Sequence, residues 1–298
     1  MNVRELIAHA TEQLNSAGVE SARVDAELLL SHVLKVSRGG LVIAADPTPA
    51  QIAEFQTMID KRVQRIPLQH ITGRAAFRYL EVSVGPGVLT PRPETELVVD
   101  AALQHLKTFA TPDSRPLIID LCSGSAAMTI SLAIESPNSD VVGLEYIEPA
   151  FEWGVINSRE HQSAIAAKNS KLNLIQADVR GCESDSLAHY AGKASVVVAN
   201  PPYIPTWAVP RDPEVALHEP AEALYGGEDG MEFIDAVVTA AAALLLPGGL
   251  LVIEHGDTQG EDGEVSVPRA IRASGMFTSV MDHLDLAGRP RFSTGIRI

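Results

Sequence analysis

Hydrophobic positions in the first 66 residues follow the spacing of amphipathic helices. Apolar residues recur every three or four positions between Leu6 and Leu14, and again between Val24 and Leu34. Residues 48–51 (Thr-Pro-Ala-Gln) combine a capping hydroxyl, a proline at the first helical position and a polar side chain that completes a capping box. Residues 1–66 are therefore predicted to form a small helical domain.

The pattern changes after residue 66. Aromatic and branched residues between Phe77 and Val84 are typical of strands, and Gly73 and Gly85-Pro86-Gly87 are turn signals. A short β-hairpin linking two domains is the simplest interpretation. We therefore expect three parts, a helical domain, a hairpin linker and a larger domain, at residues 1–66, 67–90 and 91–298.

From residue 91 onward, nearly continuous apolar runs alternate with helical segments. Such runs are typical of parallel strands covered by helices on both faces, so the sequence predicts an α/β, Rossmann-like domain. Ligands of these sheets bind at the carboxyl ends of the strands, and each run has a polar residue at that end. The runs lie at residues 117–121, 141–145, 172–178, 196–200 and 250–254, and their polar residues are Asp120, Glu145, Asp178, Asn200 and Glu254. Residues 291–298 predict a final antiparallel strand.

The composition is that of a globular protein with a substantial core. Of the 298 residues, 46% are hydrophobic and 20% are charged, and the length suits two domains. The formal net charge of −15 argues against binding that depends on neutralising phosphates, so no direct nucleic-acid partner is expected. Cys122 and Cys182 are the two cysteines, and their spacing indicates neither a disulfide framework nor a metal site.

No membrane segment is expected either. The first residues lack the apolar core of a signal peptide. The apolar stretch 237–253 is interrupted by Pro247-Gly248-Gly249, which predicts a helix, a turn and a buried strand rather than a membrane span. The sequence therefore predicts a cytoplasmic protein.

A loop of small residues follows the first strand run and has the sequence Asp120-Leu121-Cys122-Ser123-Gly124-Ser125-Ala126. Small side chains let the backbone approach a ligand at the start of the next helix. Glu145 ends the next strand, where a carboxylate can accept hydrogen bonds from both ribose hydroxyls. Together they indicate an adenosine-containing cofactor. With Gly124 as the one glycine, a tight turn without a ligand stays an alternative, and the pyrophosphate of a nicotinamide dinucleotide is disfavoured.

The tetrapeptide Asn200-Pro201-Pro202-Tyr203 directly follows the fourth strand run. Consecutive prolines fix φ and remove backbone donors, so this segment presents carbonyls without competing N–H groups. The Asn200 side-chain oxygen and the Pro201 carbonyl can each accept one N–H of a planar NH₂ group. This pairing would direct the nitrogen lone pair at a methyl group and stabilise charge developing on nitrogen, beside the aromatic surface of Tyr203. Methylation of a planar NH₂ group is predicted, with Asn200, Pro201 and Tyr203 as catalytic residues; a proline turn without function is the alternative.

Over nearly the whole chain these features resemble the HemK/PrmC family, which methylates the glutamine of the Gly-Gly-Gln motif in class I peptide-chain release factors. Adenine-N6 methyltransferases share the Asn-Pro-Pro-Tyr motif. The helical domain and residues 91–96 (Pro-Arg-Pro-Glu-Thr-Glu) are more specific to the HemK/PrmC family. The other matching segments are residues 67–73, Phe77, 89–90, 218–220 and 226–230.

The resemblance implies a class I methyltransferase fold and S-adenosylmethionine as the cofactor, with S-adenosylhomocysteine as the product. It implies that the helical domain helps to recognise the release factor. The implied cofactor-binding residues are Asp120, Cys122, Ser123, Gly124, Ser125, Ala126, Glu145, Asp178, Val179 and Asn200. The implied substrate-binding residues are Phe77, Asn200, Pro201, Pro202 and Tyr203.

The chain departs from the family at the cofactor. The family loop commonly has the sequence Asp-Leu-Gly-Thr-Gly-Ser-Gly, whereas Cys122, Ser123 and Ala126 stand here, and Glu145 replaces the usual Asp. Val179 stands where an aromatic residue is frequent. These departures predict weaker cofactor binding. They leave a degenerate, non-catalytic binding protein as one alternative, beside an adenine-N6 nucleic-acid methyltransferase.

Glu254 and His255 have the residue types of an acid–base or metal pair. Successive side chains on a strand point to opposite faces, so a site that both residues share is disfavoured. We expect packing or hydrogen bonding beside the fifth strand instead. Cys122 is expected to be a small loop residue and not a nucleophile.

Overall fold

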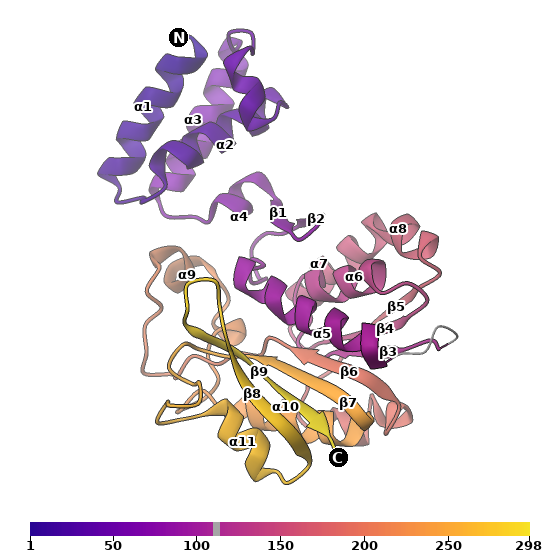
Figure 1. The fold of residues 1–298 in the computed structure, drawn as a ribbon. Helices are drawn as coiled ribbons and strands as arrows, with labels where there is room; N and C mark the ends of the chain where they lie inside the picture. The colour runs from indigo at the N-terminus through magenta and orange to yellow at the C-terminus, as the bar shows by residue number, and fades with distance from the viewer. Residues whose placement is uncertain (110–113) are drawn as a thin grey trace. The chain divides into compact units, whose positions relative to one another are not determined.

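The computed structural model describes residues 1–109 and 114–298 of the chain (Figure 1). They form two compact units. The helical unit comprises residues 1–74 and 210–219, and the sheet unit comprises residues 75–209 and 220–298. Nothing in the sequence pattern indicated that residues 210–219 pack with the N-terminal helices.

The helical unit is built on three amphipathic helices, α1 (Val3–Ser16), α2 (Ala22–Leu34) and α3 (Pro49–Val63). Asn2 and Thr48 close capping boxes at the starts of α1 and α3, as the sequence predicted for α3. The shorter helices are η1 (Arg38–Val42), α4 (Leu68–Thr72) and α9 (Pro213–His218). The largest fully buried side chains of this unit are Leu14, Leu29, Leu30, Phe55 and Ile59.

An ion-pair network ties α9 to this bundle. Arg62 is buried and bonds both Asp25 and Glu214 at 2.7 Å, and Arg65 bonds the second oxygen of Glu214 at 2.7 Å. Burial alone would raise the pKa of Glu214, but hydrogen bonds from Arg65 and Arg62 lower it. His218 lies 3.0 Å from the carbonyl of Gln64. Residues far apart in the sequence thus complete one fold.

Glu214→Ala is expected to destabilise the helical unit by about 3 kcal/mol, because it leaves the buried Arg62 with one carboxylate in place of two. Hydrogen exchange of α3 amides, together with urea unfolding, measures this change. The exposed Glu54 on α3 offers the matched control, Glu54→Ala. Equal exchange rates in the two variants would contradict the expectation.

The predicted hairpin is present as β1 (Arg74–Phe77) and β2 (Leu80–Ser83). Phe77 is 1% exposed, and with Val82 and Val84 it joins the core of the sheet unit. The hairpin thus adds apolar side chains to that core.

The sheet unit contains a seven-stranded sheet of order β5-β4-β3-β6-β7-β9-β8. The pairs from β5 through β7 are parallel, whereas β9 is antiparallel to both β7 and β8. Sequential strands run outward from β3 toward β5, and the next strand, β6, lies on the other side of β3. The strands are β3 (Leu117–Asp120), β4 (Asp140–Glu145), β5 (Lys171–Gln176), β6 (Ala194–Ala199), β7 (Leu245–Glu254), β8 (Phe277–Leu284) and β9 (Pro290–Arg297). This is the predicted α/β, Rossmann-like class.

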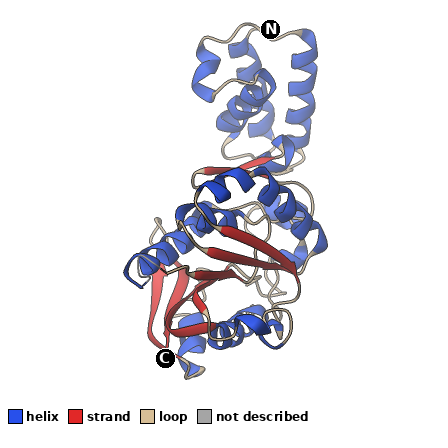
Figure 2. Cartoon of the chain, turned by 90° about the vertical axis from the view of Figure 1, so that its right-hand side faces the viewer, coloured by secondary structure: helices blue, strands red, loops and turns tan. Residues whose placement is uncertain are grey.

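Helices cover both faces of the sheet (Figure 2). One face packs against α5 (Glu96–Phe109), α6 (Ala127–Glu135), α7 (Glu148–Glu160) and α8 (Gln162–Ala167). The other face packs against α10 (Glu232–Leu244) and α11 (Val267–Ala273). The 3₁₀ turns of this unit are η2 (Pro93–Thr95), η3 (Cys182–Ser184), η4 (Ala188–Tyr190) and η5 (Ala221–Ala223).

Two details differ from the sequence pattern. The expected turn at residues 247–249 lies inside β7, at a register shift against β6, with Gly248 at a φ of 83°. The edge strand β8 was not predicted, because exposed and half-buried residues make up most of it. Of the helices in residues 1–109 and 114–298, none is both long and apolar enough to cross a bilayer.

Candidate active site

The parallel register brings the predicted polar residues to one edge of the sheet. Asp120 at the end of β3 pairs with Val198 in β6, two residues before Asn200. Glu145 is the last residue of β4 and Glu254 is the last residue of β7. Because β3 lies between β4 and β6, residues 120–126 (the cofactor loop) begin at the point where the strand order reverses. Ligands of doubly wound sheets bind at such a point.

The cofactor loop is fixed by hydrogen bonds to both neighbouring strands. Leu121 donates its N–H to Val198 at 3.0 Å, and Ser123 donates to Leu144 at 2.9 Å. The Glu145 carboxylate accepts N–H groups from Gly124 and Ile147, each at 2.7 Å. Burial raises the pKa of Glu145, and these backbone donors counteract the rise. Glu145 therefore shapes the loop besides standing at the predicted ribose position.

The loop residues fit an adenosine-containing cofactor. Gly124 has a φ of 52°, and a Cβ there would meet no atom within 4 Å, so the loop leaves open space beside its backbone. Asp120 Oδ1 is buried without a hydrogen-bond partner, which leaves an acceptor available at the end of β3. Burial raises the pKa of the Cys122 thiol well above its usual range, so this thiol is protonated and is no nucleophile.

Ala126 adopts a left-handed conformation with a φ of 63°. A Cβ makes this conformation unfavourable by roughly 1–2 kcal/mol, and glycine avoids that cost. The resemblance places glycine at this position. The left-handed backbone at residue 126 is thus a physical reason for the glycine of the family loop. Ala126 adopts the same conformation with backbone strain.

Asp120 is expected to make stability depend on pH. Burial raises its pKa from 3.8 to about 7, against the hydrogen bond that Thr129 donates at 2.7 Å. The folded state binds the proton more tightly than the unfolded state, so this contribution to stability falls as pH rises from about 4 to about 7. Asparagine does not titrate, so Asp120→Asn lacks this pH dependence. The unfolding free energy of the variant minus that of the wild type, measured by urea titration at each pH, should therefore increase by up to about 4 kcal/mol between about pH 4 and about pH 7. A difference that stays constant with pH would refute this expectation.

The residues that the resemblance placed around the adenine and the substrate lie in three kinds of environment. Asp178 follows β5, and Arg180 bonds its carboxylate at 2.6 Å, which lowers its pKa. Val179 is 4% exposed and packs in the core beside α10. Phe77 is buried in the core on the other face of the sheet, which packs against α5 to α8. Direct contact between Phe77 and a substrate would therefore require that core to open. The roles of all three residues stay predictions.

Residues 200–203 (the amide motif) leave β6 at the same edge. The Asn200 side chain donates Nδ2–H to the hydroxyl of Thr95 at 3.2 Å. Within residues 1–109 and 114–298, neither Asn200 Oδ1 nor the Pro201 carbonyl accepts a hydrogen bond. The two acceptors that the sequence proposed for a planar NH₂ group are therefore unengaged.

Residues 226–230 (the backing segment) fix the amide motif from behind. Gly226 donates its N–H to the Ile204 carbonyl at 2.9 Å, and Ile204 forms a bridge with Tyr225. A Cβ on Gly226 would clash with the Pro202 carbonyl, and a Cβ on Gly230 would clash with the Tyr203 carbonyl. The sequence matched this segment to the family without revealing its role, which is close backbone packing.

Two side chains from the end of β7 and beyond complete this support. Gln259 donates Nε2–H to the Tyr203 carbonyl at 3.2 Å and accepts the Gly256 N–H at 2.9 Å. The Tyr203 hydroxyl lies 3.5 Å from Glu254 Oε1. Burial raises the pKa of this hydroxyl above its usual range. Sequence reasoning missed Gln259 and Thr95, since both reach the motif from distant segments.

Glu254 and His255 do point apart, as expected for adjacent strand residues. Glu254 is 1% exposed and faces the amide motif, and burial raises its pKa to about 7. His255 is fully buried on the other side, where Nε2 lies 2.9 Å from Ser293 and 3.4 Å from Asp282. Burial is the main reason that its pKa is lowered.

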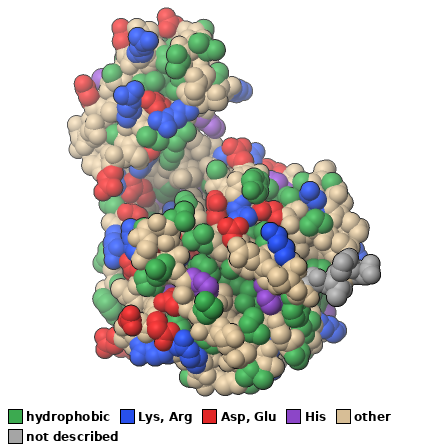
Figure 3. Space-filling model, viewed as in Figure 1, with side chains coloured by type: hydrophobic (Ala, Val, Ile, Leu, Met, Phe, Trp, Pro, Cys, Tyr) green, Lys and Arg blue, Asp and Glu red, His purple; other side chains and the backbone are tan. Residues whose placement is uncertain are grey.

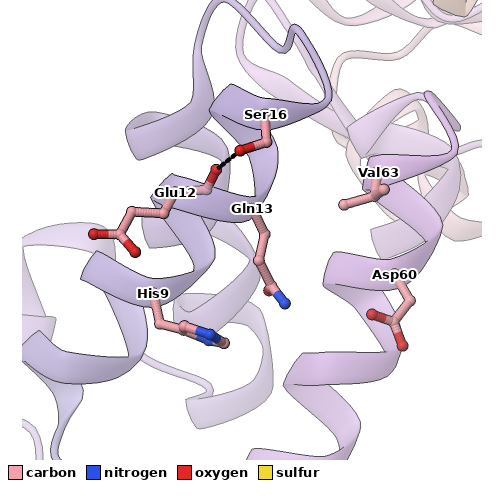
Figure 4. Close-up of a pocket in the computed structure, with 6 residues that line it drawn as sticks. All are labelled: His9, Glu12, Gln13, Ser16, Asp60 and Val63. Carbon is pink, nitrogen blue, oxygen red and sulfur yellow. Dashed lines mark hydrogen bonds between the residues drawn. The ribbon is translucent and has the colours of Figure 1, made fainter.

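A shallow groove lies between α1 and α3 in the helical unit (Figure 4). The Ser16 hydroxyl bonds the Glu12 carbonyl at 2.9 Å within α1. The groove is open to solvent, and most of its lining residues are exposed and polar. These residues do not form a recognisable catalytic arrangement. Its lining residues are His9, Glu12, Gln13, Ser16, Asp60 and Val63.

Known proteins resemble both the helical unit and the whole chain. Residues 5–73 match the family model described as the PrmC N-terminal domain. The release factor glutamine methyltransferase of Mycolicibacterium smegmatis is 41% identical over 297 residues, which cover 99% of this chain and 98% of that relative. The chain belongs to the release factor glutamine methyltransferase family. The enzyme of that name from Streptomyces coelicolor is also 41% identical, over 97% of this chain and 95% of its own length.

Membership of this family confirms the predicted fold class, the predicted methyltransferase activity and S-adenosylmethionine as the cofactor. A 4-amino-L-phenylalanine/4-methylamino-L-phenylalanine methyltransferase from Streptomyces pristinaespiralis is 34% identical, over 92% of this chain and 88% of that protein. The relatives of this chain thus include an enzyme named for an amino group other than a glutamine amide.

Proposed function

We propose that this protein transfers a methyl group from S-adenosylmethionine to the glutamine side-chain nitrogen in the Gly-Gly-Gln motif of class I peptide-chain release factors. S-adenosylhomocysteine is the second product. The observation that carries the proposal is the pair of unengaged acceptors, Asn200 Oδ1 and the Pro201 carbonyl, on a segment fixed by the backing segment and Gln259. The relatives named as release factor glutamine methyltransferases support this substrate.

Each residue of the amide motif has a task that follows from its chemistry. S-adenosylmethionine supplies an electrophilic methyl group on a sulfonium. Asn200 and Pro201 accept the two N–H groups of the glutamine, which turns the nitrogen lone pair toward that methyl group and stabilises positive charge on nitrogen. Pro202 stiffens the segment and Tyr203 covers the flat amide. The scheme needs no strong base, because the surplus proton is acidic once the nitrogen is methylated.

The cofactor occupies the loop side of the same edge in this proposal. Residues 122–126 and Asp120 surround its methionine end, Glu145 binds the ribose, and Asp178 and Val179 flank the adenine. The carboxylate of Glu145 already accepts two backbone N–H groups through separate oxygens. Each carboxylate oxygen has a second lone pair, so both ribose hydroxyls still have an acceptor.

The release factor is the protein partner that we propose, with residues 1–66 as its recognition domain, residues 67–90 as the linker and residues 91–298 as the catalytic domain. Lys and Arg side chains are interspersed with Asp and Glu on the face shown in Figure 3, and they do not form one continuous basic surface there. The net charge of −15 likewise disfavours a nucleic-acid substrate. Release factors act in translation, so we propose the cytoplasm as the location.

A methyl-transfer assay tests the substrate directly. Purified protein with labelled S-adenosylmethionine should label a class I release factor and should leave its Gly-Gly-Ala variant unlabelled. DNA, RNA and 4-amino-L-phenylalanine serve as competing substrates in parallel reactions. Equal labelling of the Gly-Gly-Ala variant, or labelling of a competitor alone, would refute the proposed substrate.

A further inference from the structure

Asn157 in α7 is a fully buried polar side chain that lies against the cofactor loop. Its Nδ2 donates one hydrogen bond to the Ser125 carbonyl of the cofactor loop and one to the Ser83 carbonyl at the end of β2, each at 2.9 Å. Its Oδ1 accepts the Ser83 N–H at 2.6 Å. One side chain therefore joins the cofactor loop to the hairpin.

These three partners fix the orientation of the Asn157 amide. A backbone N–H requires an acceptor and two carbonyls require donors, so the amide oxygen faces the Ser83 N–H and both NH₂ protons are engaged. Burying a polar group costs free energy unless it is hydrogen-bonded, whereas an apolar side chain packs without such partners. Packing alone therefore does not account for an asparagine at this position, but the bonds to Ser83 and Ser125 do.

The cofactor loop depends on such a bond because its backbone is strained. Ser125 lies between Gly124 and Ala126, which both have left-handed backbones, with φ angles of 52° and 63°. A strained backbone persists only where its surroundings determine it, and Ala126 carries a Cβ that makes the strain larger. Asn157 holds the carbonyl that lies between these two residues. Without this bond the loop could relax to another conformation.

The same helix meets the cofactor loop at two further points. The Ile147 N–H at the start of α7 bonds one oxygen of Glu145 at 2.7 Å, and the other oxygen of Glu145 accepts the Gly124 N–H. Gly154 lies about one turn before Asn157, and a Cβ there would stand 3.2 Å from the Gly124 carbonyl. The missing side chain at residue 154 thus allows the close approach that the Asn157 bond needs.

We propose that Asn157 is a positioning residue for S-adenosylmethionine binding, which holds the cofactor loop in its binding conformation and couples that loop to β2. This inference rests on the proposed placement of the cofactor against residues 122–126. Energetic coupling between two sites is reciprocal, so a ligand that orders the loop also orders the strand that is bonded to the same side chain.

Asn157→Ala tests this role through cofactor affinity. Calorimetry with S-adenosylmethionine should show a Kd that is raised about tenfold or more, because the Ser125 carbonyl loses its partner. Ser139→Ala is the matched control. Ser139 is also fully buried and its hydroxyl bonds the Ser136 carbonyl at 2.7 Å, but it precedes β4, at the end opposite Glu145. Its replacement should leave the Kd unchanged.

Two further variants separate loop conformation from general stability. Gly154→Ala should raise the Kd about threefold or more, because its Cβ displaces the Gly124 carbonyl, while the gain in helix propensity offsets the cost of the new contact to stability. It decides the question if Asn157→Ala does not fold. Ala126→Gly removes left-handed strain, so in the Asn157→Ala background it should recover at least about threefold in affinity.

Hydrogen exchange measures the coupling to β2. In the wild type, S-adenosylmethionine should slow exchange of the cofactor loop and of β2, whereas in Asn157→Ala the effect on β2 should disappear.

A wild-type Kd in either folded variant, Asn157→Ala or Gly154→Ala, would overturn the inference. So would an equal rise in Ser139→Ala, no recovery by Ala126→Gly, or a wild-type loop and β2 that the cofactor leaves unprotected. If the wild type met these expectations but labelled no release factor, the proposed substrate would be refuted and the role of Asn157 would stand.

Discussion

Asn200→Ala is expected to lower kcat by about two to three orders of magnitude while the protein still folds. The substitution removes one of two acceptors for the substrate NH₂ group, and the loss falls on the transition state, in which positive charge develops on nitrogen. Comparable losses follow the removal of one preorganised polar group from other active sites. The rate of methyl transfer under single turnover measures the effect.

Asn173→Ala is the control for Asn200→Ala. Asn173 is exposed on the edge strand β5, away from the β6 end, and its replacement should leave the rate unchanged. Calorimetry with S-adenosylmethionine and thermal unfolding show whether cofactor site and fold persist. Near-wild-type transfer by a folded Asn200→Ala protein would rule out the acceptor role.

Gly230→Ala is expected to lower kcat by about 100-fold, although residue 230 lies outside the amide motif. The new Cβ would clash with the Tyr203 carbonyl and come within 2.9 Å of Gln259 Nε2, and the φ of 80° adds left-handed strain. The motif must shift to relieve the clash, and a displacement of about 1 Å in a reacting group is enough for a 100-fold loss. Steady-state kinetics on the release factor measure it.

Gly275→Ala separates strain from displacement. Gly275 has a φ of 69°, but a Cβ there would meet nothing within 4 Å. This control should lower the unfolding free energy by about 1–2 kcal/mol through strain alone and leave kcat unchanged. If the two alanine variants lost activity equally, close packing against the amide motif would not be the cause.

The sequence was sufficient for those parts of the site that depend on chain-local patterns. Apolar runs predicted the parallel strands, and their polar ends predicted which edge carries Asp120, Glu145 and Asn200. The motif itself predicted two acceptors for a planar NH₂ group, and its consecutive prolines remove the backbone donors that would compete with that group. These predictions depend on how apolar residues repeat along the chain and on the chemistry of individual residues such as proline.

Contacts across long stretches of chain were not predictable in this way. Thr95 reaches Asn200 across 105 positions, and it lies in a short 3₁₀ turn that has no periodic signal. Gly230 contacts Tyr203 backbone to backbone, so no side-chain pattern records the contact. The placement of Arg62 against Glu214 depends on the tertiary fold alone, because no local rule links residues so far apart.

The ion pair between Arg62 and Glu214 joins two segments that are synthesised at different times. The helices α1 to α3 leave the ribosome early, but Glu214 is made about 150 residues after the buried Arg62 with which it pairs. Until then Arg62 has Asp25 as its carboxylate partner within the described helical unit. We expect a nascent chain that ends before residue 210 to carry a loosened helical unit, which tightens when α9 arrives. The N-terminal helices would then reach their final packing only after α9, which follows the amide motif in the sequence, has been synthesised.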